Sequence, residues 1–117
     1  MRTAIFVYEP TTLTITTSEP DLALISFGSA GATRREQTRL APSALTSIDV
    51  EPGIYKILSV QPVGVTATRD SQIEVLASAT KRPVPVPDPG AQLSLTGTEI
   101  MAALQAFLAV DARGLTL

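Results

Sequence analysis

The sequence predicts a mainly β protein: an antiparallel β-sandwich of jelly-roll or immunoglobulin-like type, then a proline-rich spacer and one C-terminal α-helix. Seven or eight short segments with turn residues between them fill the first 80 positions, and most of them alternate apolar and polar residues. Prolines then recur at every second position from Pro83 to Pro89. One helical repeat of apolar residues follows, from about Gly97 to Val110.

The composition supports a folded β protein. The chain has 117 residues, enough for one domain with a real core, and 44% of them are hydrophobic. Only 17% are charged, against about 25% in typical domains. Fifteen threonines supply polar surface in place of charge, and this β-branched residue favours strands.

The expected strands follow one another at short intervals. They are Thr3–Tyr8, Thr11–Thr17, Leu22–Phe27, Arg34–Leu40, Ala44–Val50, Ile54–Val60, Val63–Thr68 and Gln72–Ala77. The first is apolar on both faces, which predicts a central strand covered on two sides. In the second, Leu13 and Ile15 face the core and the threonines between them face outward. No helical crossover separates these strands, which argues against a parallel α/β fold.

The fourth and fifth expected strands differ in their residue patterns. Arg34–Leu40 is polar and favours an edge strand, with one irregular helical turn as the alternative. Ala44–Val50 alternates, with Ile48 and Val50 on its core face. Pro52-Gly53 suits a type II turn, which predicts a hairpin between this strand and the next one. The string from Val50 to Ile57 resembles the hydrophobic, Pro-Gly, Tyr hairpins of many β-sandwich modules.

We divide the single domain into three parts. Residues 1–80 form the sandwich, 81–95 the proline-rich spacer and 96–117 the helix and tail. The alternating prolines of the spacer neither donate to a sheet nor continue a helix. They predict a stiff, extended segment that rises about 3 Å per residue.

The C-terminal helix has an unusual outer face. Thr96-Gly-Thr-Glu99 matches a capping box, and an apolar stripe begins at Ile100. No charged residue lies between Glu99 and Asp111, although an exposed helix face usually carries Lys, Glu or Arg. We therefore expect the helix to be covered on more than one side; the alternative is that alanine serves helix propensity on an exposed face. The expected interaction residues are Ile100, Ala102, Leu104, Ala106, Phe107 and Leu108.

The residue content disfavours most catalytic chemistry. The chain has no cysteine and no histidine, so disulfides, thiolate metal sites and the usual general base near neutral pH are absent. Ser78-Ala-Thr-Lys81 matches the S-x-x-K pattern of penicillin-binding proteins, but their Ser-Asp-Asn and Lys-Thr-Gly motifs are missing. The carboxylate pairs Asp49/Glu51 and Asp70/Glu74 lie beside predicted turns and lack the spacing of a calcium loop. We predict a non-enzymatic protein with no metal and no cofactor.

One basic cluster remains a candidate site. Arg34, Arg35 and Arg39 follow the glycine-containing loop 28–33 and are candidates for binding an anion or an acidic partner. The other interpretation is a solvated edge strand whose charges discourage pairing with another sheet. The net charge of −2 and the pI near 5.0 give no footprint for nucleic acid.

These observations favour a structural or interaction protein of the bacterial or phage assembly type. We expect it to associate with itself or with a protein partner through the helix and the spacer arm. The alternative is a small ligand-binding sandwich module for carbohydrate or an anion, although 4% aromatic residues equip it poorly for sugars. The first apolar run stops at Glu9, too short for a signal peptide, and no run is long enough to span a membrane. We expect a cytoplasmic or virion-associated location.

Overall fold

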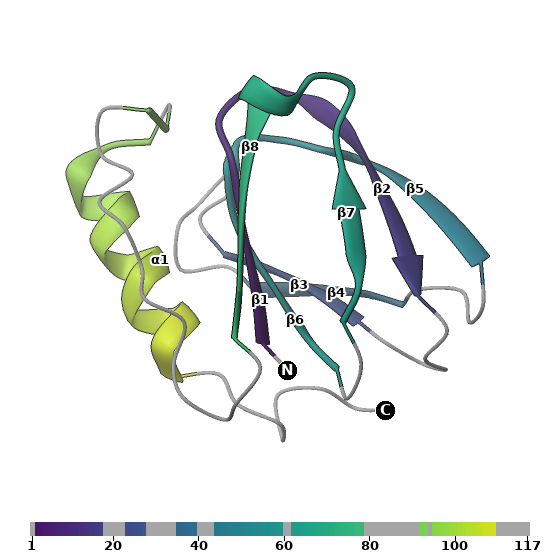
Figure 1. The fold of residues 1–117 in the computed structure, drawn as a ribbon. Helices are drawn as coiled ribbons and strands as arrows, with labels where there is room; N and C mark the ends of the chain where they lie inside the picture. The colour runs from purple at the N-terminus through teal and green to yellow at the C-terminus, as the bar shows by residue number, and fades with distance from the viewer. Residues whose placement is uncertain are drawn as a thin grey trace.

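The computed structural model describes residues 2–17, 23–27, 35–39, 44–59, 62–78, 92–93 and 95–109. This part of the chain is mainly β, with one helix near the C-terminus, as the sequence predicts (Figure 1). The elements are β1 (Arg2–Val7), β2 (Thr11–Thr17), β3 (Ala23–Phe27), β4 (Arg35–Arg39), β5 (Ala44–Val50), β6 (Gly53–Leu58), β7 (Gly64–Thr66), the 3-10 helix η1 (Asp70–Gln72), β8 (Ile73–Ser78) and α1 (Gly97–Ala109).

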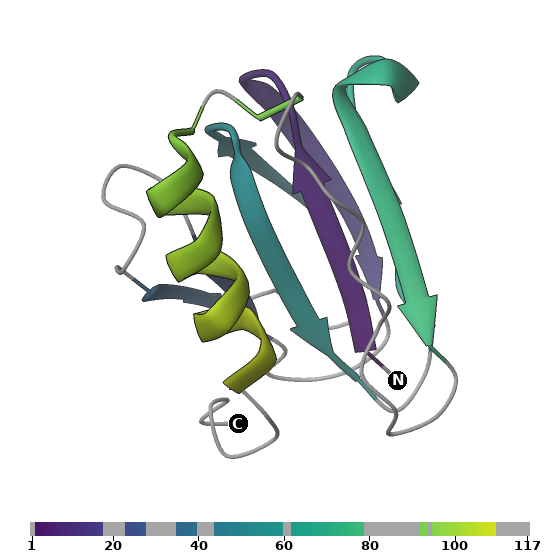
Figure 2. The ribbon, with the colours of Figure 1, turned by 90° about the vertical axis from the view of Figure 1, so that its left-hand side faces the viewer.

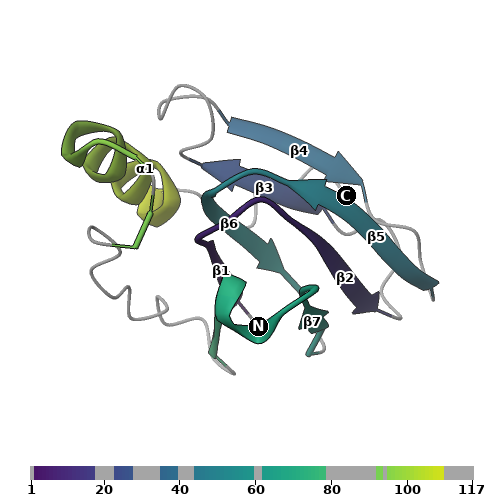
Figure 3. The ribbon, with the colours of Figure 1, turned by 90° about the horizontal axis from the view of Figure 1, so that it is seen from above.

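The strands form two antiparallel sheets. The larger has five strands in the order β4-β3-β6-β1-β8, and the smaller has three in the order β5-β2-β7. The polar strand β4 lies at an edge, as its composition predicts, and β1 lies between two neighbours. Viewed from above, α1 lies on one side of the larger sheet and the smaller sheet on the other (Figure 3).

The hairpin predicted at Pro52-Gly53 is wrong. β5 pairs with β2, whereas β6 pairs with β1 and β3, so the chain crosses from one sheet to the other between Val50 and Gly53. The Tyr55 hydroxyl donates a hydrogen bond to the carbonyl of Glu51, four residues earlier, over 2.6 Å. In β-sandwiches such a tyrosine contact stabilises the corner where the chain changes sheets. The residues fit a corner as well as a hairpin, and local pattern does not distinguish the two.

The two sheets share a buried apolar cluster, which we call the inter-sheet cluster. Its members are Ile5, Val7, Leu13, Ile15, Val50, Tyr55 and Ile57. The alternation predicted for β2 is confirmed, because Leu13 and Ile15 are fully buried while Thr16 is exposed. Ile48 packs against the cluster from β5, on the face that the sequence assigns to the core.

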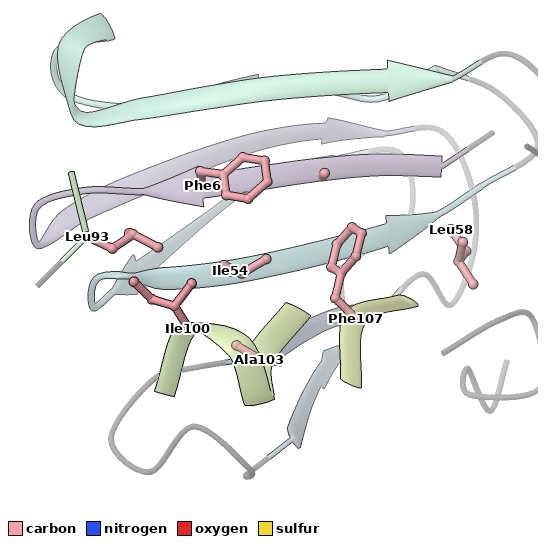
Figure 4. Close-up of a cluster of buried hydrophobic side chains, with 8 residues drawn as sticks. Phe6, Ile54, Leu58, Leu93, Ile100, Ala103 and Phe107 are labelled. Carbon is pink, nitrogen blue, oxygen red and sulfur yellow. The ribbon is translucent and has the colours of Figure 1, made fainter. Parts of the chain in front are cut away.

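A second cluster lies between the larger sheet and the helix, and we call it the helix cluster (Figure 4). It contains Ala4, Phe6, Ile54, Leu58, Leu93, Ile100, Ala103 and Phe107. Alternate residues of β1 and β6 therefore enter different clusters, because successive side chains of a strand point to opposite faces. This explains why the first strand of the sequence is apolar on both faces.

The helix covers the sheet of its own chain. Figure 2 shows α1 in front of β6, with β1 and then β8 beyond it. Leu93, near the end of the predicted spacer, is already buried in the helix cluster. Residues 81–91, with the alternating prolines, lie outside the described residues, so the extended spacer stays a prediction.

Candidate functional site

The basic cluster is only partly described. Arg35 and Arg39 are the first and last residues of β4, where the backbone pairs with Phe27 and Ala23 of β3. Arg34 lies outside the described residues. The structure thus places two of the three arginines on an edge strand of the larger sheet, which suits the interpretation as a charged edge.

The predicted interaction residues of the helix divide into an inner and an outer set. Ile100 and Phe107 are only 5% and 1% exposed and pack in the helix cluster of their own chain. Leu104 and Ala106 are half-buried against the same cluster, and Ala102 is half-buried. Of Leu108 the structure describes the backbone only. The inner residues hold the helix to its own sheet, so contact with another molecule is left to the outer side.

The outer side of α1 exposes a large apolar side chain. Met101 is 57% exposed, and Gln105, one turn further along, is also exposed. The charge gap between Glu99 and Asp111 covers both positions. Figure 1 shows α1 at the outside of the fold, with the strands on one side of it. An uncharged outer face with an exposed methionine is a candidate contact surface.

The helix start follows the sequence prediction closely. The Thr96 hydroxyl accepts a hydrogen bond from the Glu99 amide over 3.2 Å, and the Thr96 amide donates to the Glu99 carboxylate over 3.3 Å. The hydroxyl also donates to that carboxylate over 2.9 Å. These reciprocal contacts form the predicted capping box and satisfy early helix amides.

Sequence reasoning missed a buried lysine beneath the end of the helix. Lys56, on β6, is 4% exposed, and its Nζ donates to the carbonyl oxygen of Phe107 over 3.1 Å. The same nitrogen lies 4.8 Å from the centre of the Phe107 ring. A cation at a helix C-terminus is favoured by the exposed carbonyls there and by the helix dipole. The only signal in the sequence is a lysine inside an otherwise apolar strand.

A polar network at the β1–β2 corner is the second feature that was not predicted. Gln72 is buried at the end of η1, and its side-chain oxygen accepts from the Thr11 hydroxyl over 2.8 Å and from the Arg69 amide over 2.9 Å. The Gln72 carbonyl accepts from the amide of Tyr8 over 2.8 Å. Gln72 thereby joins the corner to the segment before β8.

The ionisable side chains at this corner form a hydrogen bond and an ion pair with one another. The Tyr8 hydroxyl donates to Glu74 over 2.5 Å, and the exposed Arg69 and Glu9 side chains form an ion pair of 2.9 Å. Burial, together with the hydrogen bond to the Glu74 carboxylate and its charge, raises the pKa of Tyr8 well above its ordinary value of 10.0. Tyr8 therefore keeps its proton, and remains a hydrogen-bond donor, to a higher pH than an ordinary tyrosine, and this cluster ties the corner together.

Two of the carboxylates noted in the sequence accept hydrogen bonds from neighbouring hydroxyls. Asp49 accepts from the Thr12 hydroxyl over 2.7 Å across the β2–β5 pair, and Glu74 accepts from Tyr8. Among the residues that the structure describes, no three His, Cys, Asp or Glu side chains group together in a way that could hold a metal ion. No helix in the described ranges is long and apolar enough to cross a bilayer.

No protein-family model matches the chain, and no curated protein or solved structure is significantly similar to it.

Proposed function

We propose that this chain is a non-enzymatic structural protein that associates with further copies of itself through the outer side of α1. The observation that carries the proposal is Met101, a large apolar side chain that is 57% exposed. It lies within a helix that carries no charge from Ile100 to Val110. Docking this face against a second copy would remove apolar surface from water, which is the main driving force of protein association.

Other features support association over ligand binding. A carbohydrate module presents exposed aromatic rings, but Phe6, Tyr55 and Phe107 are buried, and the Tyr8 hydroxyl is bonded to Glu74. The remaining aromatic, Phe27, has no described side chain. The described aromatic residues thus support the core and the corner, whereas Met101 is available at the surface.

We also propose that the two sheets form a β-sandwich of immunoglobulin-like rather than jelly-roll type. In that fold, strands C′, C and F are neighbours in one sheet and B pairs with E in the other. In the larger sheet of this chain, β4 takes the position of strand C′, β3 that of C and β6 that of F. In the smaller sheet, β2 takes the position of B and β5 that of E. The tyrosine contact at the start of β6 lies where strand E passes to strand F. β1 then takes the place of strand G, which in that fold is the last strand.

Light scattering of the full chain and of Met101→Glu tests the proposed association. We expect the full chain to exceed its 12.3 kDa monomer mass at high concentration, and Met101→Glu to lower the assembly mass by about half or more, because a buried charge opposes docking. Ser47→Glu, an exposed position on β5, is the matched control and should leave the mass unchanged. A monomeric full chain, or an unchanged mass for Met101→Glu, would contradict the proposal.

A further inference from the structure

The two edges of the larger sheet differ in their charge. Three of the five residues of β4 are charged, whereas β8 has a single charged residue in six, Glu74. Val75 on β8 is 38% exposed. Charged side chains on an edge strand oppose pairing with another sheet, and an apolar edge permits it. β8 is thus the less protected edge, and Figure 2 shows it as the outermost strand on the side away from β3 and β4.

The backbone of β8 presents hydrogen-bonding groups along this edge. The Tyr8 amide donates to the Gln72 carbonyl, and the register continues with Val7 opposite Ile73. In an antiparallel pair, alternate residues direct their N–H and C=O groups to opposite sides. Residues 74, 76 and 78 therefore bond to β1. Residues 75 and 77 direct both their N–H and C=O groups outward, whereas at residue 73 the amide donates to the Asp70 carbonyl and only the C=O group is directed outward. Among the described strands, none pairs with that outer side.

From this alternation we infer that β8 pairs antiparallel with β8 of a second copy, joining two five-stranded sheets into one. The favoured register places Val75 opposite Val75 of the second copy and Ile73 opposite Ala77. The amides of Val75 and Ala77 then donate to the carbonyls of Val75 and Ile73 of the second copy, giving about four hydrogen bonds across the two-fold axis. The inference rests on the proposed self-association and names a second surface for it.

The charges of β8 disfavour the neighbouring register on one side. In the inferred register, Glu74 lies opposite Leu76 of the second copy. A shift by one pair in one direction would place Glu74 opposite Glu74, a like-charge contact that destabilises strand pairs. The opposite shift pairs Val75 with Ala77 and takes the Ile73 carbonyl out of the pairing. The Tyr8 hydroxyl also holds the Glu74 carboxylate toward β1, the side opposite to the outer edge of β8.

The edges of the smaller sheet are weaker candidates. β7 has only three residues, and a short edge strand offers few bonds to a partner. On β5, the exposed residues that the structure describes are the polar Ser47 and Asp49. β8 combines six paired residues, one engaged charge and an exposed valine, which favours it as the pairing edge. With the helix face, it would give the chain two different self-contacts, enough to build assemblies larger than a dimer.

Single-cysteine variants test the register, since the chain has no cysteine of its own. In the inferred dimer the two copies of residue 75 lie about 5.5 Å apart between Cα atoms, within disulfide range. We expect Val75→Cys to cross-link in mild oxidant at least about tenfold faster than the exposed control Ser47→Cys. A Val75→Cys rate equal to that of the control would overturn the inference.

A third variant, Met101→Cys, separates this inference from the proposed function. Cross-linking at residue 101 without cross-linking at residue 75 would overturn β8 pairing and leave the helix-face proposal standing. Cross-linking at 75 alone would support β8 pairing and contradict a symmetric contact between two helix faces. Rates at both positions equal to that of Ser47→Cys, with a monomeric mass, would contradict both.

Amide hydrogen exchange of the unmodified chain provides a readout that does not depend on substitution. The amides of Val75 and Ala77 should exchange at least about tenfold more slowly at millimolar than at low micromolar concentration, because pairing protects them. The amides of Glu74 and Leu76 already bond to β1 and serve as internal controls. Equal exchange of residues 75 and 77 at both concentrations would overturn β8 pairing.

Discussion

At the scale of single residues, Lys56 links the helix to the sheet. Its amine is buried, donates to the Phe107 carbonyl and lies over the Phe107 ring. Lys56→Met keeps most of the side-chain volume and removes the donor. We expect the free energy of unfolding to fall by about 1–3 kcal/mol, since a buried acceptor loses a charged partner. Urea denaturation at pH 7 measures the change.

A surface pair is the matched control for Lys56. Arg69→Met breaks the exposed ion pair with Glu9 and should cost less than about 1 kcal/mol. Lys56→Met could instead prove as stable as the unmodified chain, or more stable. That result would mean that the desolvation cost of burying the amine equals or exceeds the stabilisation from its contacts with Phe107.

Tyr8 predicts a dependence of stability on high pH. Its pKa is raised in the folded state, so above about pH 10 the unfolded chain loses the phenol proton while the folded chain keeps it. The contribution of Tyr8 is therefore fully present below pH 10 and declines as the pH rises further. Tyr8→Phe, which loses the bond to Glu74, should be less stable by about 1 kcal/mol at pH 7.

The pH series itself provides the check on Tyr8. The stability difference between Tyr8→Phe and the unmodified chain, measured by urea denaturation from pH 7 to 11.5, should shrink only above about pH 10. A difference that stays constant over this range would mean that folding does not raise the pKa of Tyr8.

At the scale of elements, α1 depends on its first turn. Thr96→Ala removes the hydroxyl of the capping box and should lower the free energy of unfolding by about 1 kcal/mol. Thr98→Ala, an exposed position inside the same helix, is the control and should have little effect or stabilise slightly. Thermal denaturation followed by circular dichroism compares them, and equal midpoints would show that the cap contributes nothing.

The extents of the elements could be predicted from the sequence, because periodicity and turn residues are local signals. The sequence predicts the helix at about Gly97–Val110 and the structure has it at Gly97–Ala109, and the strand Thr11–Thr17 has the predicted bounds. The partners of strands could not be predicted. Pro52-Gly53 marks a reversal, but whether β6 returns beside β5 or enters the other sheet is decided by packing far along the chain.

The candidate contact surface could be predicted only in part. The charge gap of the helix is visible in the sequence and predicts that the helix is covered on more than one side. The structure assigns Ile100 and Phe107 to the chain's own core and exposes Met101, which was not among the expected interaction residues. The apolar stripe predicts which side of the helix is buried, but it does not identify the sheet against which that side packs. Lys56 and Gln72 were missed because their burial depends on contacts distant in sequence.

At the scale of the whole molecule, β1 and β6 join the two cores. Phe6 and Ile54 enter the helix cluster, while Ile5 and Ile57 enter the inter-sheet cluster. Loss of either layer would expose one face of these strands to water and weaken the packing of the other face. We therefore expect the helix and both sheets to unfold in one cooperative transition.

Two conservative core substitutions test this cooperativity. Phe107→Leu trims the helix cluster, and Ile15→Val trims the inter-sheet cluster at a cost of about 0.5–1.5 kcal/mol. In urea, circular dichroism at the helix band and tyrosine fluorescence, measured with Tyr8→Phe in the background so that it senses Tyr55 between the sheets, should give one midpoint for each variant. Both probes should shift together, whichever cluster is trimmed. If Phe107→Leu moved only the helix signal, α1 would unfold as a separate unit, and the shared strands would not couple the two layers.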